Sequence, residues 1–599
     1  MIPTEVSILC WSRPESPDLN FAKVAEFLGL KPAFLTLNAD STGLDYFEKN
    51  LPEHPVCLVA SGRTVARICS NAGFKGQFKS FLFRRIAYFL IHTVEADQLQ
   101  TAALNFLSDG ALSSISPVDS ADAQYRVSSS DKAICRQFAG LSFGPVNPNH
   151  DLTFASRGDA NGLRPLIMIG SQVFFAALER DECRLFVVGC DTVADIDESV
   201  SPALDIRRCF SQLIPVMMFL KHVFKDRAWH AEKPYANFTL DDPLLQKRYG
   251  FLDYGKLLET MDSSGFSTSV AFIPWNFKRT DSATAALFRS RPDKFSIAVH
   301  GCDHGEAEFN SNDTGLLGRK TREAIRRMHC HQKSTGLPFD RVMIFPQGLF
   351  SPAALKALKA NNFLAAVNST AWPASDAEIA VRLRDLLDVA ILNYESFPLF
   401  VRRYPGDVFG CALDLFLGKP LLLVEHHVYF RHGYEEIADF ASRVNALDER
   451  ISWHGLGYVL DRASLSKTGP GPDRHMKLYA HNAWIAGETE QERVYCISKA
   501  DANNLRVQDI KLSGKPVPFT RDGDTLTMSL RPAKGANSRL EITFENPWGE
   551  SDIEYRLLEY VRVFARRHLT EIRDNYIARS ESLLSLAYRV TGLGARPQQ

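Results

Sequence analysis

The chain has 599 residues, of which 45% are hydrophobic and 23% are charged, and these shares are those of folded globular proteins. They exclude a disordered, collagen-like or disulfide-scaffold protein, and at roughly 150 residues per domain the length predicts three or four domains. Lysine and arginine number 69 against 70 acidic residues, so the net charge of -1 gives no indication of nucleic acid as a partner.

The eleven cysteines are scattered along the chain and form no C-x-x-C pair. We therefore expect reduced thiols in the core. The first residues lack the basic and apolar regions of a secretory signal, and no stretch reaches the roughly 18 apolar residues that a membrane helix needs. The sequence thus predicts a cytoplasmic protein without a transmembrane segment.

Residues 1–225 alternate short apolar runs with helix-like segments, which predicts a doubly wound, flavodoxin-like α/β domain with a largely parallel sheet. The runs 56–59 and 185–188 lead into small loops, where such a sheet often binds a ligand. Neither loop matches a nucleotide fingerprint. Cys190 follows the second run without an evident histidine and acid partner, so we expect it to be structural.

Repeated strand and helix signals run from 235 to 460, which is long enough for a (β/α) barrel. The first apolar run of this block leads directly into Asp241 and Asp242, and Pro243 prevents the strand from continuing. Burying two adjacent carboxylates is costly unless a cation or hydrogen-bond donors compensate. The pair therefore indicates a candidate site.

Two further apolar runs of the block end in histidines. His300 and His304 are four residues apart, a spacing that lets both imidazoles face one metal ion. His426 and His427 follow a later run, and because strand side chains alternate, only one of them should face the site; we favour His426. Residues at the carboxyl ends of barrel strands meet in the active site, so we expect these groups to come together.

Another histidine pair, His329 and His331, lies in the charged, helix-like run 319–333. Side chains two residues apart on a helix diverge and do not share an ion. We therefore expect both residues at the surface.

Residues 475–547 change to alternating polar and apolar positions, which predicts a small β-sandwich. Asp522 and Gly523 form a hairpin signal within it. The glycine- and proline-containing stretch 467–472 is the expected linker before the sandwich.

The region 551–599 is predicted to be a helical tail. We expect it to dock onto the body of the protein, with peripheral contact to a membrane surface as the alternative. Its apolar positions fall on one helical face, with arginines among the remaining positions. The apolar positions are Ile553, Leu557, Tyr560, Val561 and Phe564, and the arginines are Arg556, Arg562 and Arg566.

One carboxylate and two imidazoles for a metal, a second carboxylate as base and a third imidazole as acid are what metal-assisted amide hydrolysis requires. The order of these groups resembles the polysaccharide deacetylases of the NodB-homology carbohydrate esterase class over residues 235–460. The motifs that carry the resemblance are 239–242, 300–304, 335–338, 345–348 and 424–426.

The resemblance implies a (β/α) barrel, often incomplete, that binds a divalent metal, usually zinc. It implies that the metal is held by Asp242, His300 and His304. It further implies that Asp241 is the catalytic base and that His426 is the general acid.

The third motif departs from the family pattern. The family usually has an arginine two residues before its proline and a tyrosine after it, and these places hold Ile344 and Gln347 here. The arginine orients and charges the base, so a guanidinium must be supplied from elsewhere or be dispensed with. The tyrosine acts through its backbone N–H at the oxyanion, and Gln347 retains that donor.

The resemblance thus implies an enzyme acting on a carbon–nitrogen bond other than a peptide bond. Its substrate would be an N-acylated carbohydrate, and the reaction would remove an acyl group, usually acetyl, from an amino sugar of a glycan or glycan precursor. Two alternatives stay open: a catalytically impaired carbohydrate-binding or assembly protein, and a deacylase of a non-sugar amide.

Overall fold

The computed structural model describes residues 5–38, 46–47, 49, 51, 57–120, 122–156, 162–374, 379–469, 473–487, 494–532, 535–548 and 557–578. The chain divides into two units. The first is Met1–His230 with Arg382–Arg384 and Lys467–Gly469, and the second is Ala231–Val381, Asp385–Ser466 and Pro470–Gln599. The expected linker 467–472 is wrong in its first residues, because 467 and 468 belong to strand β22 (Ser464–Thr468) of the sandwich, while 470–472 lie outside the described residues. The division into four domains stays a prediction. Among the described helices, none is long and apolar enough to cross a membrane.

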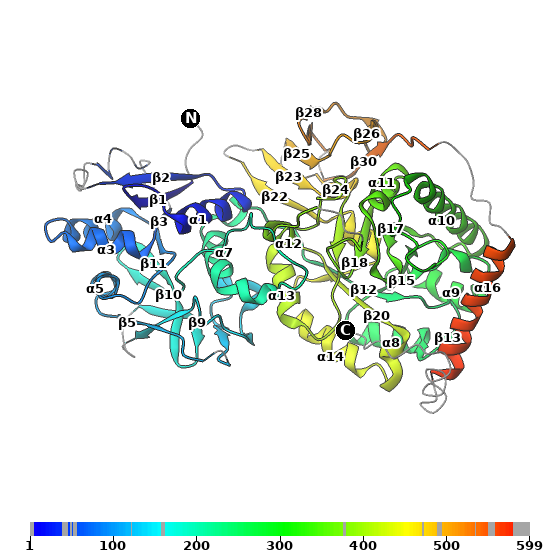
Figure 1. Cartoon of the computed structure of the whole chain (residues 1–599), viewed down its shortest axis with the longest axis horizontal. Helices are drawn as coiled ribbons and strands as arrows, with labels where there is room; N and C mark the ends of the chain where they lie inside the picture. Colours follow the sequence, from blue (N-terminus) through cyan, green and yellow to red (C-terminus); the bar gives the residue numbers. More distant parts are fainter. Residues whose placement is uncertain are drawn as a thin grey trace. The chain divides into compact units, whose positions relative to one another are not determined.

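The first unit is built on one mixed sheet with helices packed against it, so the predicted α/β class is confirmed (Figure 1). Its strands are β1 (Val6–Trp11), β2 (Pro32–Leu37), β3 (Cys57–Ala60), β4 (Tyr88–Ile91), β5 (Leu112–Pro117), β6 (Tyr125–Val127), β7 (Ser142–Phe143), β8 (Leu152–Ser156), β9 (Leu163–Ile169), β10 (Gln172–Arg180) and β11 (Cys183–Val188). Its longer helices are α1 (Ser16–Phe27), α3 (Gly62–Ser70), α4 (Lys75–Arg85), α5 (Gln98–Leu107) and α7 (Phe210–Phe224).

Only half of this sheet is parallel, which corrects the expectation of a largely parallel sheet. The strands β2-β1-β3-β4-β11 run parallel, whereas β10, β9, β8, β5, β6 and β7 pair antiparallel. The reason is local, because β9, β10 and β11 follow one another through two-residue turns that begin at Gly170 and Asp181. Both residues have positive φ, as hairpin turns require.

Cys190 follows β11 and is buried, with its thiol donating to the backbone oxygen of Thr192 at 3.3 Å. Burial raises the pKa of this thiol far above its ordinary value. It therefore stays protonated, as expected for a structural cysteine. All eleven cysteines are free thiols.

The second unit contains the predicted (β/α) barrel. Its seven parallel strands follow the order β19-β18-β17-β16-β15-β12-β20 (Figure 1). An isolated parallel bridge between Arg403, two residues after β19, and Leu423 of β20 links the two ends of this order, and the two-residue strand β21 (Ser452–Trp453) pairs with β12 outside it. The strands are β12 (Tyr235–Asp241), β15 (Thr268–Phe272), β16 (Phe295–His300), β17 (Asp340–Ile344), β18 (Ala365–Asn368), β19 (Leu399–Val401) and β20 (Leu421–His426).

The helices between these strands start and stop at residues suited to the task. Several begin at an aspartate whose side chain accepts backbone N–H bonds of the first turn, as Asp253, Asp281 and Asp313 do. Two end at Gly336 and Gly418, whose φ values of 73° and 85° favour glycine. The helices are α8 (Tyr254–Ser264), α9 (Ser282–Ser290), α10 (Thr314–Thr335), α11 (Pro352–Ala360), α13 (Val408–Leu417) and α14 (Glu435–Asn445).

The predicted β-sandwich follows the barrel, with sheets in the order β22-β23-β25-β29-β28 and β24-β30-β26-β27. The hairpin expected at Asp522 and Gly523 joins β28 to β29. Buried Lys359 of α11 donates to Asn504 at 2.8 Å and pairs with Asp501, which ties the sandwich to the barrel. The strands are β22 (Ser464–Thr468), β23 (Arg474–Leu478), β24 (Asn482–Ala486), β25 (Tyr495–Ala500), β26 (Val507–Leu512), β27 (Lys515–Pro516), β28 (Thr520–Asp522), β29 (Thr525–Leu530) and β30 (Asn537–Phe544).

The tail forms helix α16 (Leu557–Ile572), which continues into the short π-helix η8 (Arg573–Ile577), and η8 fixes it to the barrel through polar contacts (Figure 1). The Tyr249 hydroxyl donates to Asp574 and the backbone N–H of Gly250 donates to Asn575, both at 2.7 Å. Most of the predicted apolar face points outward instead of into the contact: Leu557 is 78% exposed, and Val561 and Phe564 are about half exposed. Tyr560, also about half exposed, is the exception, because its ring lies 5.0 Å from that of Trp275 of the barrel. Ile553 and Arg556 lie outside the described residues, and membrane contact stays a prediction.

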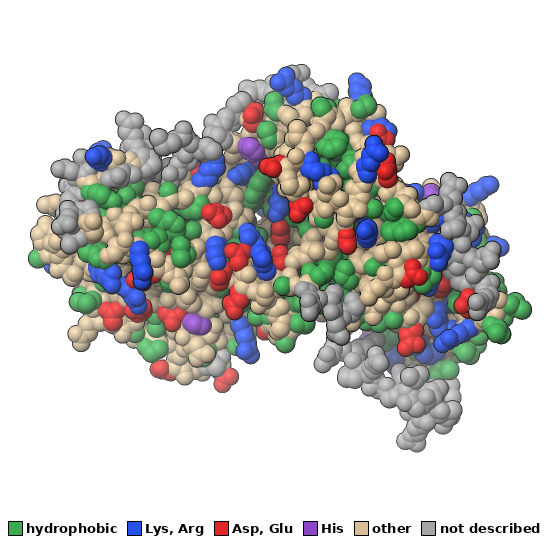
Figure 2. All heavy atoms as spheres, turned by 45° about the horizontal axis from the view of Figure 1, so that its top comes forward, with side chains coloured by type: hydrophobic (Ala, Val, Ile, Leu, Met, Phe, Trp, Pro, Cys, Tyr) green, Lys and Arg blue, Asp and Glu red, His purple; other side chains and the backbone are tan. Residues whose placement is uncertain are grey.

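Charged side chains of both signs are mixed on the face of the molecule that Figure 2 displays. Figure 2 shows Lys and Arg side chains interspersed with Asp and Glu over the face it displays, in keeping with totals of 69 and 70. Such mixing creates no large field of one sign. An excess of positively or negatively charged side chains around one cavity would therefore be a property of that cavity and not of the whole chain.

The expectation of two surface histidines on α10 is wrong for His331. His329 is exposed, but His331 has no exposed surface. Its ring lies 4.7 Å from that of Phe272, and its Nε2 atom is 2.8 Å from the Thr280 hydroxyl. Its position continues the buried stripe of α10, three residues after Met328, and this spacing overrides its polarity.

Burial lowers the pKa of His331 to about 4. The unfolded chain takes up a proton near pH 6.5 whereas the folded chain does not, so stability is lost as the pH falls from about 6.5 to 4. The variant His331→Gln keeps a partner for Thr280 but does not titrate. We therefore expect its free energy of unfolding to fall by about 2–3 kcal/mol less than that of the wild type between pH 7 and pH 4.5. Urea unfolding of both proteins at pH 7 and pH 4.5 measures it. A stability difference that is equal at both pH values would contradict the assignment.

Candidate metal centre

The carboxyl ends of the barrel strands bring the expected side chains to one rim. Asp241 is the last residue of β12, His300 the last of β16 and His426 the last of β20. Asp241 and His426 are direct neighbours across the β12–β20 pair. Parallel strands that end together present the residues that follow them at one end of the barrel.

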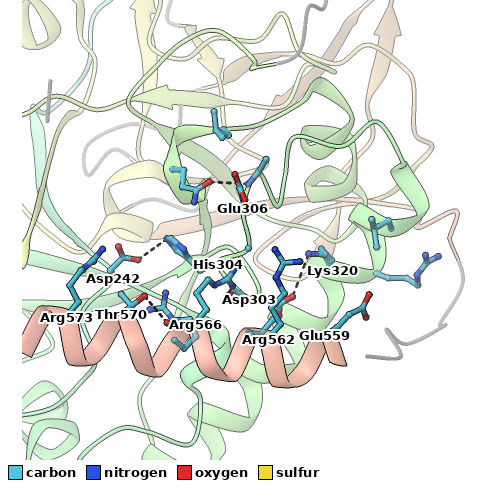
Figure 3. A pocket seen from close by; sticks show the side chains of 18 residues that line it. Asp242, Asp303, His304, Glu306, Lys320, Glu559, Arg562, Arg566, Thr570 and Arg573 are labelled. Carbon is cyan, nitrogen blue, oxygen red and sulfur yellow. Dashed lines mark hydrogen bonds and ion pairs between the residues drawn. The ribbon is translucent and has the colours of Figure 1, made fainter. Parts of the chain in front are cut away.

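Asp242, His300 and His304 converge on one point. The Asp242 Oδ1 atom lies 3.3 Å from His300 Nε2 and 3.0 Å from His304 Nε2, the latter contact being visible in Figure 3. One ligand atom from each residue lies within 4.8 Å of the others. The buried Oδ1 atom has no hydrogen-bond partner among the described residues, so its lone pair faces the same point as the two imidazoles. This donor set fits a divalent cation such as zinc.

The charge state of Asp242 agrees with that fit. Burial by itself would raise the pKa of this carboxyl, but His304 and His300 outweigh burial and hold the pKa well below its ordinary value. Asp242 is therefore an ionised carboxylate, the form that binds a metal.

A backbone contact sets the tautomer of His300. Its ring is buried, and its Nδ1 atom lies 3.0 Å from the carbonyl oxygen of Ile344. A carbonyl oxygen only accepts, so Nδ1 carries a proton, and Nε2 is the atom that would bind a cation held beside Asp242. Ile344, which lacks the expected guanidinium, thus serves the site through its backbone.

The loop that carries His304 is organised by buried Glu308. Its carboxylate accepts the backbone N–H groups of Cys302, Asp303 and His304 at 3.2, 2.9 and 3.0 Å. Cys302, Asp303 and Glu308 are also close enough to hold an ion. However, Asp303 pairs with Arg327 at 2.8 Å, and burial raises the Cys302 pKa well above its ordinary value. We therefore assign this cluster to shaping the loop.

Three residues around the centre have strained backbones. Asp242, His304 and Gln347 have φ values of 77°, 57° and 59°, in the left-handed region that non-glycine residues seldom adopt. Each such residue costs about 1 kcal/mol or more, and strain of this kind concentrates at functional sites. Contacts such as those of Glu308 hold these conformations in place.

Arg402 supplies the guanidinium that the third motif lacks. Its Nη1 atom donates to Asp241 Oδ1 at 2.8 Å, and its Nη2 atom donates to the other carboxylate oxygen. Burial would raise the pKa of Asp241, but Arg402, with His300 and His426, brings the pKa below its ordinary value. Asp241 is therefore held as an oriented, ionised carboxylate.

Sequence reasoning missed Arg402, although a signal was present. The residue follows the apolar run 399–401, just as Asp241 and His300 follow theirs. Applied to every strand end of the barrel, the same rule would have found it.

His426 ends β20, whereas His427 begins the short helix η7 (His427–His432). His427 is buried against the tail, with its Nε2 atom 3.5 Å from Asp574 and its ring stacked on Phe251. His426 lies beside Asp241 on the neighbouring strand. The expected roles of His426 as acid and Asp241 as base stay predictions.

Gln347 lies in the short helix η6 (Pro346–Gly348) that follows β17. Its side-chain oxygen accepts the backbone N–H of Ala307 at 3.1 Å. This bond joins the loop after β17 to the loop that carries His304. The oxyanion role of the Gln347 N–H stays a prediction.

Comparisons with known proteins add the following findings. No protein-family model matches the chain, and no curated protein matches it. Among solved structures, the chain is similar to Agd3, described as a novel carbohydrate deacetylase, at 9% identity and a TM-score of 0.45, covering 91% of this chain and 100% of that chain. It is also similar to a family 4 carbohydrate esterase from Bacillus anthracis, at 14% identity and a TM-score of 0.25, over 39% of this chain and 86% of that one. A family 4 carbohydrate esterase from Streptomyces lividans in complex with acetate matches at 12% identity and a TM-score of 0.23, over 37% and 92%.

The contacts of Glu308 predict how the loop controls metal binding. In Glu308→Gln one acceptor oxygen becomes an NH₂ donor facing backbone N–H groups, so His304 loses its support. We expect the affinity for zinc to fall about 10- to 100-fold, as measured by competition with a chromophoric chelator. Glu306→Gln, the same change at an exposed position two residues away, serves as the control. Equal affinities of the two variants would argue against a positioning role.

Proposed function

We propose that the chain is a metal-dependent hydrolase that removes an N-acyl group, typically acetyl, from an amino sugar of a glycan or glycan precursor. One observation carries the proposal: an ionised Asp241, fixed by Arg402, lies directly beside the converging lone pairs of Asp242, His300 and His304. An oriented base next to a three-ligand cation site is the arrangement that hydrolysis of an unactivated amide needs.

A divalent cation held by Asp242, His300 and His304 would supply Lewis-acid chemistry, polarising the acyl carbonyl and lowering the pKa of water. In the proposed reaction Asp241 takes a proton from the attacking water, and Arg402 keeps this carboxylate ionised and oriented until then. The Gln347 backbone N–H donates to the oxyanion.

Breakdown then needs a proton on the nitrogen that leaves. His426, beside Asp241 on the neighbouring strand, donates it as the carbon–nitrogen bond breaks. The products are a carboxylate and a free amino sugar, which together account for the amide and one water molecule.

The alternative of a catalytically impaired binding protein rests on the missing guanidinium at Ile344. Arg402 provides a bidentate guanidinium to the same carboxylate from another strand, which favours turnover. A non-sugar amide as substrate is the remaining alternative, and the assay below includes it.

The first test separates metal binding from proton transfer. We expect His300→Ala to lose both bound zinc and acetate release from N-acetylated sugars. Asp241→Asn should keep its zinc but lose about 10²- to 10⁴-fold in kcat. His329→Ala removes an exposed histidine outside the centre and is the control. Elemental analysis and an acetate assay with N-acetylated sugars and a simple N-acetyl amide give the readouts. Zinc that is retained in His300→Ala, or acetate released by Asp241→Asn at the wild-type rate, would refute the assignment.

A second test addresses Arg402. We expect Arg402→Ala to lower kcat/KM about 10- to 100-fold without changing zinc content, because the charge-assisted bonds to the base are lost. Millimolar guanidinium ions should restore part of the activity, which they would not do for a merely structural residue. Arg403→Gln, which removes a neighbouring guanidinium that pairs with Asp414, should gain nothing from added guanidinium. The absence of rescue in Arg402→Ala would count against the positioning role.

A further inference from the structure

A cavity of about 1780 Å³ opens beside Asp242 and His304. Helix α16 forms its opposite wall, and Figure 3 shows Arg562, Arg566 and Arg573 projecting from the helix toward the cavity. The tail helix thus contributes directly to the space in front of the candidate metal centre.

The position of this wall is fixed by the barrel. Glu571 of α16 pairs with Arg279, and the Arg566 guanidinium donates to the carbonyl oxygen of Asp303 at 2.9 Å. Asp303 belongs to the loop that carries His304. The arginines of the tail and the metal centre are therefore linked through one loop.

The lining of the cavity is more basic than the molecule as a whole. Six cationic side chains face it against four carboxylates. Of the four acids, Asp242 belongs to the metal centre, and Asp303 is paired with Arg327, which does not line the cavity. Of the six cations, Lys320 pairs with Glu308 at 3.4 Å and Arg573 pairs with Asp574 at 2.7 Å, and these two acids do not line the cavity either. The cations are Arg319, Lys320, Arg562, Arg566, Arg567 and Arg573, and the remaining acids are Glu306 and Glu559.

Arg567 is the most informative of these residues. Only 5% of its surface is exposed, and its Nε atom has no hydrogen-bond partner among the described residues. The adjacent Arg566 also has an unsatisfied Nε, and burial, together with the charge of Arg567, lowers the Arg566 pKa. Burying the Arg567 guanidinium beside a second, part-buried positive charge and with an unsatisfied N–H group costs free energy, a cost that a bound anion offsets.

We propose that this arginine wall binds a negatively charged group of the substrate, a phosphate or a carboxylate, next to the sugar that carries the N-acyl group. The proposed substrate is therefore an anionic amino sugar and not a neutral one. The planar guanidinium is suited to such a group because it can donate two parallel hydrogen bonds to two oxygens. This inference rests on the proposed function for the identity of the neighbouring sugar, but anion binding by the wall does not depend on turnover.

Binding is tested with sugars that carry no acyl group and cannot turn over. Glucose 1-phosphate, glucuronate and glucose are titrated calorimetrically into the zinc-loaded full chain. We expect one or both charged sugars to bind at least about tenfold more tightly than glucose, equivalent to one good charge-assisted contact. The tighter of the two identifies phosphate or carboxylate as the preferred group. Equal binding of glucose, or no binding of either charged sugar at millimolar concentration, overturns the proposal.

Variants assign the binding to the wall. Arg567→Gln and the exposed Arg562→Gln should each weaken the charged sugar about tenfold, and the second variant keeps the test valid if the first does not fold. Arg326→Gln, which removes an exposed arginine paired with Glu323 and absent from the cavity lining, is the matched control. Charged-sugar affinities that are unchanged in both wall variants overturn the proposal.

His300→Ala separates this inference from the proposed function. If the charged sugars still bind to this metal-free variant, the wall and not the metal holds the anion. If they bind only when zinc is present, the anion is a metal ligand and the proposal is wrong. If they bind to the wall while no N-acetylated sugar is deacylated, the proposed function fails and the anion site stands.

Discussion

The structure depends on two adjacent carboxylates where β12 ends, the buried Asp241 and the part-buried Asp242. Leaving Asp241 and Asp242 unpaired in a protein interior would cost several kcal/mol for each charge. Arg402 compensates one and the imidazoles of His300 and His304 face the other. The barrel closure serves the same end, because the bridge between Arg403, two residues after β19, and Leu423 of β20 fixes the backbone next to Arg402. The contact that closes the barrel therefore also helps to place Arg402, which keeps Asp241 ionised.

His304, one of the two imidazoles that face Asp242, is placed by a loop with no regular secondary structure. Glu308 accepts three consecutive backbone N–H groups and so imposes the left-handed conformation of His304. A carboxylate suits this task because it offers two acceptor oxygens and no donor. Gln347 fastens the same loop from the neighbouring strand end through Ala307. The geometry of His304 is therefore determined by residues that touch no metal, which is how strained positions persist at functional sites.

Sequence reasoning found most groups at the barrel rim, because a strand followed by polar residues is a local signal. It missed Arg402 because a three-residue strand gives a weak pattern and an arginine is usually a surface residue. It predicted His331 at the surface because histidine is polar, although its position three residues after Met328 continues the buried stripe of α10. It expected a largely parallel first sheet, since apolar runs do not reveal whether two-residue turns join them. The hydrogen bonds of Glu308 could not be predicted from the sequence, because any residue except proline can supply the backbone N–H groups that it accepts.

In the tail helix the amphipathic sequence pattern does not predict which side chains face the barrel. Its apolar side chains, such as Leu557 and Val561, face outward, whereas Arg566 and Arg567 face the barrel, the reverse of ordinary amphipathic docking. Apart from the ring contact of Tyr560 with Trp275, hydrophobic burial therefore explains little of where this helix lies. Its polar anchors to Tyr249 and Gly250 hold it in place, and they hold it with arginines turned toward a centre built for a cation. With a divalent cation bound, the centre would carry net positive charge despite Asp242, and this charge and the arginines across the cavity would repel each other less with a further negative group between them. A negatively charged substrate would therefore join both walls of the cavity and lower their mutual repulsion, so that charge as well as the acyl group would select what enters.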